Sequence, residues 1–151
     1  MVEEKIKELG YALPNAPKPL AAYVPVLIID KIVYTAGQLP LINGELKIKG
    51  KLGKDVSDND GIKSAEICAL NCLSVVKSAA GSLDNIERII KLTVFVNSSE
   101  GFISQPKIAN GASELIGKIF GDAGKHVRSA VGVNELPLNS PVEIEMIVKL
   151  K

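Results

Sequence analysis

Residues 126–146 read HVRSAVGVNELPLNSPVEIEM, and this stretch does most to decide the fold. Its alternating apolar residues predict two neighbouring strands, 129–135 and 142–150, joined by the turn-forming sequence LPLNSP. Arg128 stands at the start of the first strand, and Glu143 lies inside the second. A permanent cation and a carboxylate on neighbouring strands can bind a small carboxylate and position a water molecule.

The same kinds of pattern predict the other elements of the chain. Helices are expected at 2–9, 62–80 and 105–120, and strands at 23–29, 32–39, 45–49 and 86–97. Pro14, Pro17 and Pro19 keep the early chain extended, Pro25 favours a sheet edge, and Asn43-Gly44 predicts a hairpin. The order β-β-β-α-β-α-β-β is an α+β pattern, in which a six-stranded sheet has two long helices packed on one face.

The second face of this sheet also needs a cover. Ile89, Leu92, Val94 and Val96 fall on both parities of one strand, and the run 26–29 does the same. Two helices cover one face only, so a sheet that is apolar on both faces predicts contact with further copies of the chain. We therefore expect a homo-oligomer.

Length and composition narrow the function classes. The 151 residues fit one domain, residues 1–151, without repeats or linkers. The net charge of +1 disfavours nucleic-acid binding, and no apolar run is long enough to span a membrane. The charged start lacks a signal-peptide core, which indicates a cytoplasmic protein. Cys68 and Cys72 are expected to be buried free thiols, because one histidine in the chain leaves too few partners for a metal site.

Several segments together resemble the RidA family, also called YjgF-like or endoribonuclease L-PSP. They are residues 34–40 (YTAGQLP), 128–131 (RSAV), 136–137 (LP) and 142–145 (VEIE); residues 10–14 (GYALP) and 124–128 (GKHVR) are similar to a subgroup with a longer N-terminus. The resemblance covers essentially the whole chain. It implies a chorismate-mutase-like fold and a homotrimer with three clefts between subunits.

The resemblance also implies a reaction. RidA-like members hydrolyse reactive enamines and imines, such as 2-aminoacrylate, to 2-oxoacids and ammonia, with no cofactor and no metal. Arg128 would bind the substrate carboxylate, and Glu143 would be the catalytic residue that holds the attacking water. The alternatives are a surface or interface salt bridge for Arg128 and an ion pair across the subunit interface for Glu143.

Three further residues match substrate-binding positions of the family. Tyr23 would line the cleft, although packing in the core or the interface explains an aromatic residue there as well. Gly37 would allow the backbone to approach the ligand closely, and a β-bulge is the other explanation. Asn110 is the nearest candidate for the polar residue at the start of the second long helix.

The sequence departs from the family pattern at two positions. Ala36 stands where deaminases of this family commonly have serine, and Ala130 stands where many members have cysteine. His126, the single histidine, adjoins the key motif and is either a loop residue or an acid–base group.

Three functions remain open at this point. The first is an imine and enamine deaminase, and the second is a non-catalytic trimer that binds small molecules, which Ala36 favours. The third, an endoribonuclease, is disfavoured by the near-zero charge and the absence of a basic aromatic groove.

Overall fold

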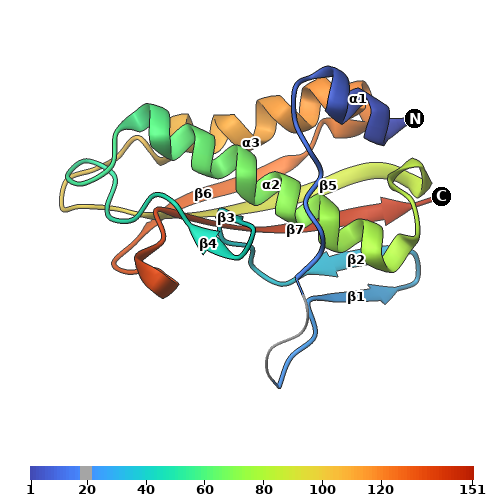
Figure 1. The fold of residues 1–151 in the computed structure, drawn as a ribbon, viewed down its shortest axis with the longest axis horizontal. Helices are drawn as coiled ribbons and strands as arrows, with labels where there is room; N and C mark the ends of the chain where they lie inside the picture. Colours follow the sequence, from blue (N-terminus) through green and yellow to red (C-terminus); the bar gives the residue numbers. More distant parts are fainter. Residues whose placement is uncertain (18–21) are drawn as a thin grey trace.

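The computed structural model describes residues 1–17 and 22–151; Pro19, expected to keep the chain extended, lies outside them. Figure 1 shows a sheet with its two long helices side by side on one face. The elements, in chain order, are α1 (Val2–Glu8), β1 (Val26–Ile29), β2 (Ile32–Thr35), β3 (Leu41–Ile42), β4 (Glu45–Leu46), α2 (Asp58–Ala80), η1 (Leu83–Asn85), β5 (Ile86–Asn97), α3 (Gln105–Phe120), η2 (Gly121–Gly124), β6 (Val127–Val133), η3 (Pro137–Asn139) and β7 (Val142–Leu150).

The main sheet has the strand order β1-β2-β7-β5-β6. The β5–β6 pair is parallel, and the other pairs are antiparallel. Alternate residues of the central strands, among them Val33, Leu92, Val94, Ile144 and Met146, are fully buried beneath α2 and α3. These side chains and the apolar faces of the two helices form the core, which confirms the predicted α+β architecture.

The prediction of six strands in the main sheet was wrong, because the segment at 45–49 does not join it. Residues 41–46 form a separate two-stranded hairpin around Asn43 and Gly44. Pro40 has no N–H to donate to a ladder. The Asn71 side chain of α2 donates to the carbonyls of Leu39 and Leu41, at 2.8 and 3.1 Å, and these bonds hold this part of the chain against the helix.

The parity argument drawn from β5 was also wrong. Ile89 pairs with Val148 and Lys91 with Ile147, so the register shifts between them, as in a β-bulge. The extra residue puts Ile89 on the same face as Leu92, and both are fully buried on the helix side. A period-2 count along the sequence cannot detect such an insertion.

The apolar run in β1 does reach both faces. Leu27 and Ile29 lie on the side away from the helices and are 55% and 57% exposed. The apolar side chains exposed on this side include Leu27, Ile29, Tyr34, Val127 and Val131, and we call it the open face. The apolar residues that remain exposed on the open face, and that still call for a covering surface, therefore belong to β1, β2 and β6 and not to β5.

Helix α2 begins at Asp58, one turn earlier than the expected residue 62. Ser57 caps it, since its Oγ accepts from the backbone N–H of Asp60 at 3.1 Å. Gly61 falls in the first turn, where a Cβ would press against Leu52. Within the described ranges, no helix combines the length and the apolar character needed to cross a membrane.

The two cysteines are buried and free, as predicted. The thiol of Cys72 lies 3.3 Å from the carbonyl of Ile144, and that of Cys68 lies 3.6 Å from the carbonyl of Val142. Burial raises the pKa of Cys72 to about 12. Both thiols therefore act as small packing groups between α2 and β7.

Candidate active site

Arg128 lies on β6, the edge strand of the sheet, with its side chain turned toward α3. Its Nη1 donates to Asn110 Oδ1 at 2.9 Å and to Ser113 Oγ at 3.1 Å, and its Nη2 lies 3.4 Å from the carbonyl of Pro106. No carboxylate within the described residues is at ion-pair distance from Arg128. The guanidinium has five N–H donors, and the contacts with α3 leave two of them free for a ligand.

Glu143 lies on β7 and points to the open face, since its neighbours Val142 and Ile144 are buried under the helices. Its carboxylate has no cation at ion-pair distance among residues 1–17 and 22–151. Burial, and secondly the charge of Glu145, raises the pKa of Glu143 above its usual value. A carboxyl group whose pKa moves toward neutrality is better suited to accept and return a proton.

Gly37 is adjacent to this carboxylate. A Cβ at Gly37 would overlap Oε1 of Glu143, so only glycine leaves room for the carboxylate where it stands. The β-bulge explanation also applies. Tyr34 pairs with Ile147, whereas Gln38 pairs with Ile144, which sets four steps along one strand against three along the other. The bulge and the close approach to Glu143 are two aspects of one local structure.

The expectation that Arg128 and Glu143 lie on neighbouring strands was wrong, because β5 lies between β6 and β7, and the two residues do not converge within one protomer. Glu143 pairs with Phe95, which pairs with Val131, three residues after Arg128. The two residues are therefore separated by two strand spacings and three residues, about 10 Å in each direction. Arg128 faces the helix side of the sheet, whereas Glu143 faces the open side. One small substrate cannot contact both side chains in a single chain.

Tyr23 lies near the opposite edge of the sheet from Arg128. It precedes β1, and four strand spacings, about 19 Å, separate β1 from β6. Its side chain is 65% exposed, so packing in the core of its own chain is not its role. The predicted residues thus fall into two groups: Arg128 with Asn110 at the β6 edge, and Glu143 with Gly37 toward the β1 side, where Tyr23 also lies.

Comparison with known proteins agrees with these motifs and this fold. The family model described as "YjgF/chorismate_mutase-like, putative endoribonuclease" matches residues 3–150. The chain belongs to this family, the YjgF/RidA family.

Individual relatives match over almost the full length. Protein TCP17 of Trypanosoma cruzi is 39% identical over 150 residues, which cover 99% of this chain and 94% of the relative. The crystal structure of the protein Atu1372 from Agrobacterium tumefaciens superposes with a TM-score of 0.94 at 43% identity, covering 99% of this chain and 92% of the other. A 2-iminobutanoate/2-iminopropanoate deaminase of Dermatophagoides farinae is 27% identical over 143 residues, covering 91% and 93%.

The departures from the family pattern can now be located. Ala36 lies beside Gly37, and its N–H donates to the carbonyl of Pro25 at 2.8 Å. Ala130 is half-buried against the core. His126 contacts the Gly124 carbonyl through Nδ1 at 2.6 Å and Ser113 Oγ through Nε2 at 3.0 Å.

Ser113 is the site residue that the sequence reasoning missed. Asn110 and Ser113 are three residues apart on α3, so their side chains lie on one face of the helix, and both accept from Arg128. The sequence signal for Ser113 is its position three residues after Asn110 in a predicted helix. Ser113 does not belong to any of the family motifs, so those motifs do not indicate it.

Proposed function

We propose that this protein hydrolyses small imines and enamines derived from amino acids, such as 2-aminoacrylate, to 2-oxoacids and ammonia. The observation that carries the proposal is the hydrogen bonding of the Arg128 guanidinium. Its guanidinium is held by acceptors of α3 and is free of any carboxylate of the described chain, and two N–H donors remain for a ligand. Such a fork suits a substrate carboxylate.

The reaction requires a water molecule and proton transfer. After an enamine tautomerises to the imine, water adds to the carbon of the C=N bond. Glu143 accepts a proton from that water and returns it toward the nitrogen. Glu143 then takes the proton of the new hydroxyl group and passes it to the amino nitrogen, so that the C–N bond breaks as the C=O bond forms, and ammonia leaves. The raised pKa of Glu143 supports both directions of this transfer.

The site is completed by a second copy of the chain. Arg128 and Glu143 lie on opposite faces of one protomer's sheet. The exposed apolar residues of the open face provide a surface for a neighbouring subunit to cover. In the proposed homotrimer, the cleft combines Arg128 and Asn110 of one protomer with Glu143, Gly37 and Tyr23 of its partner.

The test uses a pyridoxal-phosphate-dependent dehydratase that releases 2-aminoacrylate from serine. We expect the purified protein to accelerate pyruvate formation once the dehydratase is no longer limiting, and the Arg128→Ala variant to lose this effect. Pyruvate formation at the spontaneous rate in the presence of wild-type protein would overturn the proposal.

A non-catalytic trimer that binds small carboxylates is the second candidate, and Ala36 favours it. The hydroxyl that deaminases of the family commonly have at this position is absent beside Gly37 and Glu143. Binding of pyruvate in calorimetry, together with a spontaneous hydrolysis rate, would support this reading. Activity gained by Ala36→Ser would then identify the missing hydroxyl as the cause.

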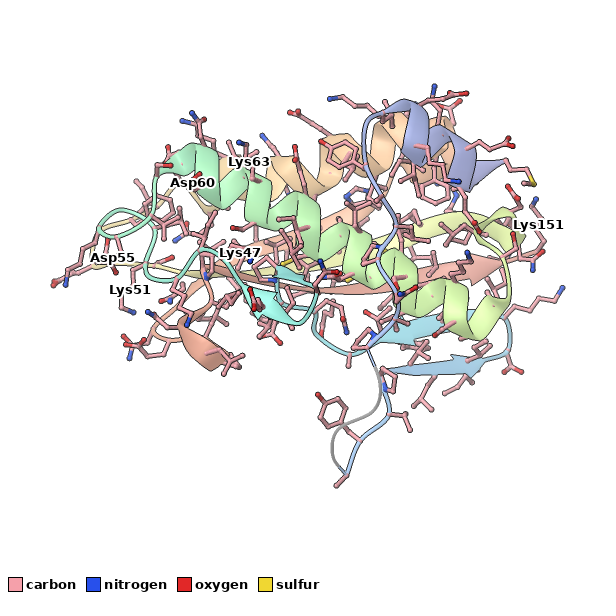
Figure 2. The ribbon with its side chains drawn as sticks, in the orientation of Figure 1. Lys47, Lys51, Asp55, Asp60, Lys63 and Lys151 are labelled. Carbon is pink, nitrogen blue, oxygen red and sulfur yellow. The ribbon has the colours of Figure 1, made fainter. Side chains whose placement is uncertain are left out.

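Endonuclease activity fits the charge distribution poorly. Figure 2 shows charged side chains of both signs around the loop before α2 and its first turns, among them Lys51, Asp55, Asp60 and Lys63. A surface of alternating sign does not provide the continuous basic groove that single-stranded RNA requires.

A further inference from the structure

A chain of hydrogen bonds connects Arg128 to the loop after α3. Arg128 Nη1 lies 3.1 Å from Ser113 Oγ, which lies 3.0 Å from His126 Nε2. His126 Nδ1 lies 2.6 Å from the carbonyl oxygen of Gly124. These residues also line a cavity of about 340 Å³ beside Arg128.

The chemistry of each group fixes the direction of these bonds. The Gly124 carbonyl only accepts, so His126 Nδ1 must carry a proton. In the neutral imidazole, Nε2 is then an acceptor, and the Ser113 hydroxyl donates to it. The lone pairs of Ser113 Oγ are thereby left for the Nη1–H of Arg128, which only donates. The directions run from Arg128 to Ser113, from Ser113 to His126 and from His126 to Gly124.

This arrangement orients the Arg128 guanidinium. Both N–H groups of Nη1 are used, one by Asn110 Oδ1 and the other by Ser113 Oγ. The free donors therefore belong to Nε and Nη2. A long side chain that is held in one orientation loses less freedom when it binds a ligand than one that must first be ordered.

We propose that Ser113 and His126 are positioning residues for Arg128: His126 orients the Ser113 hydroxyl, and Ser113 holds the guanidinium ready for a carboxylate. This inference rests on the proposed role of Arg128 as the carboxylate-binding residue. Neither Ser113 nor His126 needs to touch the substrate. In this proposal, His126, the single histidine of the chain, acts as a positioning residue and not as a general base.

The first test needs no ligand. Because His126 is the only histidine, long-range ¹H–¹⁵N spectra at pH 8 show one imidazole. We expect the proton on Nδ1 and an unprotonated Nε2. The chain has two arginines, Arg88 and Arg128, so an Arg88→Lys spectrum assigns the Arg128 Nε–H signal. That signal should be sharp in the wild type and broadened in Ser113→Ala. A proton on Nε2, or an Arg128 signal indifferent to Ser113, would overturn the proposal.

The second test measures pyruvate binding by calorimetry. Ser113→Ala should weaken binding about three- to tenfold, the value of one hydrogen bond, and Ser113→Thr should recover most of the affinity. His126→Asn can still reach Gly124 but not Ser113, whereas a Gln amide extends to the position of Nε2. Asn should therefore weaken binding more than Gln. Unchanged pyruvate affinity in Ser113→Ala would show that Ser113 has a structural role only. The same conclusion would follow if the loss of affinity across the variants matched the drop in melting temperature and did not depend on whether a hydroxyl is present at position 113.

Measurements of pyruvate binding and of imine hydrolysis by the wild-type protein distinguish a failure of this proposal from a failure of the proposed function. If wild-type protein binds pyruvate but hydrolyses no imine, the catalytic proposal fails while the variants still decide the roles of Ser113 and His126. If wild-type protein binds no 2-oxoacid at all, carboxylate binding by Arg128 is wrong, and this inference falls with it whatever the spectra show.

Discussion

A guanidinium differs from an ammonium in geometry more than in charge, and Arg128 depends on that geometry. Lysine cannot donate to Asn110 and Ser113 while also presenting a planar fork to a carboxylate. The fork is worth roughly 1.5–3 kcal/mol, so Arg128→Lys should weaken pyruvate binding about ten- to a hundredfold without unfolding the chain. Calorimetry measures the affinity, and Arg88→Lys, with the same change on a neighbouring strand, should bind normally. Equal affinity in both variants would contradict the role of Arg128.

Glu143 differs from Arg128 because it is expected to act on the reacting water. Glu143→Gln keeps nearly the same volume but cannot accept a proton, so turnover should fall about 10²–10⁴-fold. Pyruvate affinity should stay close to that of the wild type, because Arg128 is unchanged. Normal turnover in steady-state kinetics would remove Glu143 from the mechanism.

The same variant has a predicted effect on stability that depends on pH. Burial raises the pKa of Glu143 in the folded chain above its ordinary value, so folding favours the protonated carboxyl group. The stability that this group contributes is therefore fully present below the ordinary glutamate pKa, and it is lost as the pH rises through the folded pKa. At pH 7, Glu143→Gln should therefore melt at a higher temperature than the wild type, by an amount that solvent screening of the half-buried carboxylate keeps small. The difference should vanish near pH 4. A lower melting temperature at pH 7 would instead indicate an ion pair with a partner subunit.

The irregular junction between β2 and β7 brings Gly37 against Glu143. The φ of Gly37 is not in the left-handed region, so alanine is acceptable to the backbone, but its Cβ would overlap the carboxylate. Gly37→Ala should displace the carboxylate, cost about 1–3 kcal/mol and greatly reduce turnover. In a Glu143→Ala background the stability cost should disappear, because the overlapping atoms are gone. A cost that persists in the double variant would point to the backbone instead.

These junctions also mark the limit of prediction from sequence. The bounds of β5, α3 and β7 match the predicted ranges, because their apolar periodicity and flanking turn residues are local signals. The bulge after Ile89 and the extra residue between Tyr34 and Gln38 depend on a partner strand distant in sequence. Likewise, motifs identify Arg128 and Glu143 as candidates, but the contact of Ser113 with Arg128 exists only after α3 packs beside β6.

For the molecule as a whole, the exposed apolar residues of the open face favour a homo-oligomer, and we propose that this oligomer is a trimer. Sedimentation at micromolar concentration should give a mass about three times the 16.0 kDa of one chain. Leu27→Asp places a charge on the open face, where the side chain is already exposed, so the protomer should fold but fail to assemble. Leu27→Met at the same position should remain a trimer. A monomeric wild type would remove the shared cleft.

The proposed division of the site between two chains allows a direct test by mixing two impaired variants, Arg128→Lys and Glu143→Gln, at a substrate concentration too low to saturate Arg128→Lys. In Arg128→Lys the Glu143 side of each cleft is intact, and in Glu143→Gln the Arg128 side is intact. If each cleft takes Arg128 from one subunit and Glu143 from its neighbour, random reassembly of equal amounts should create intact clefts at about one quarter of the positions. Turnover should therefore rise well above that of either variant alone, after the trimers are dissociated and reassociated together. A mixture no more active than its parts would show that both residues must act within one chain. The separation of Arg128 and Glu143 across the sheet argues against that outcome.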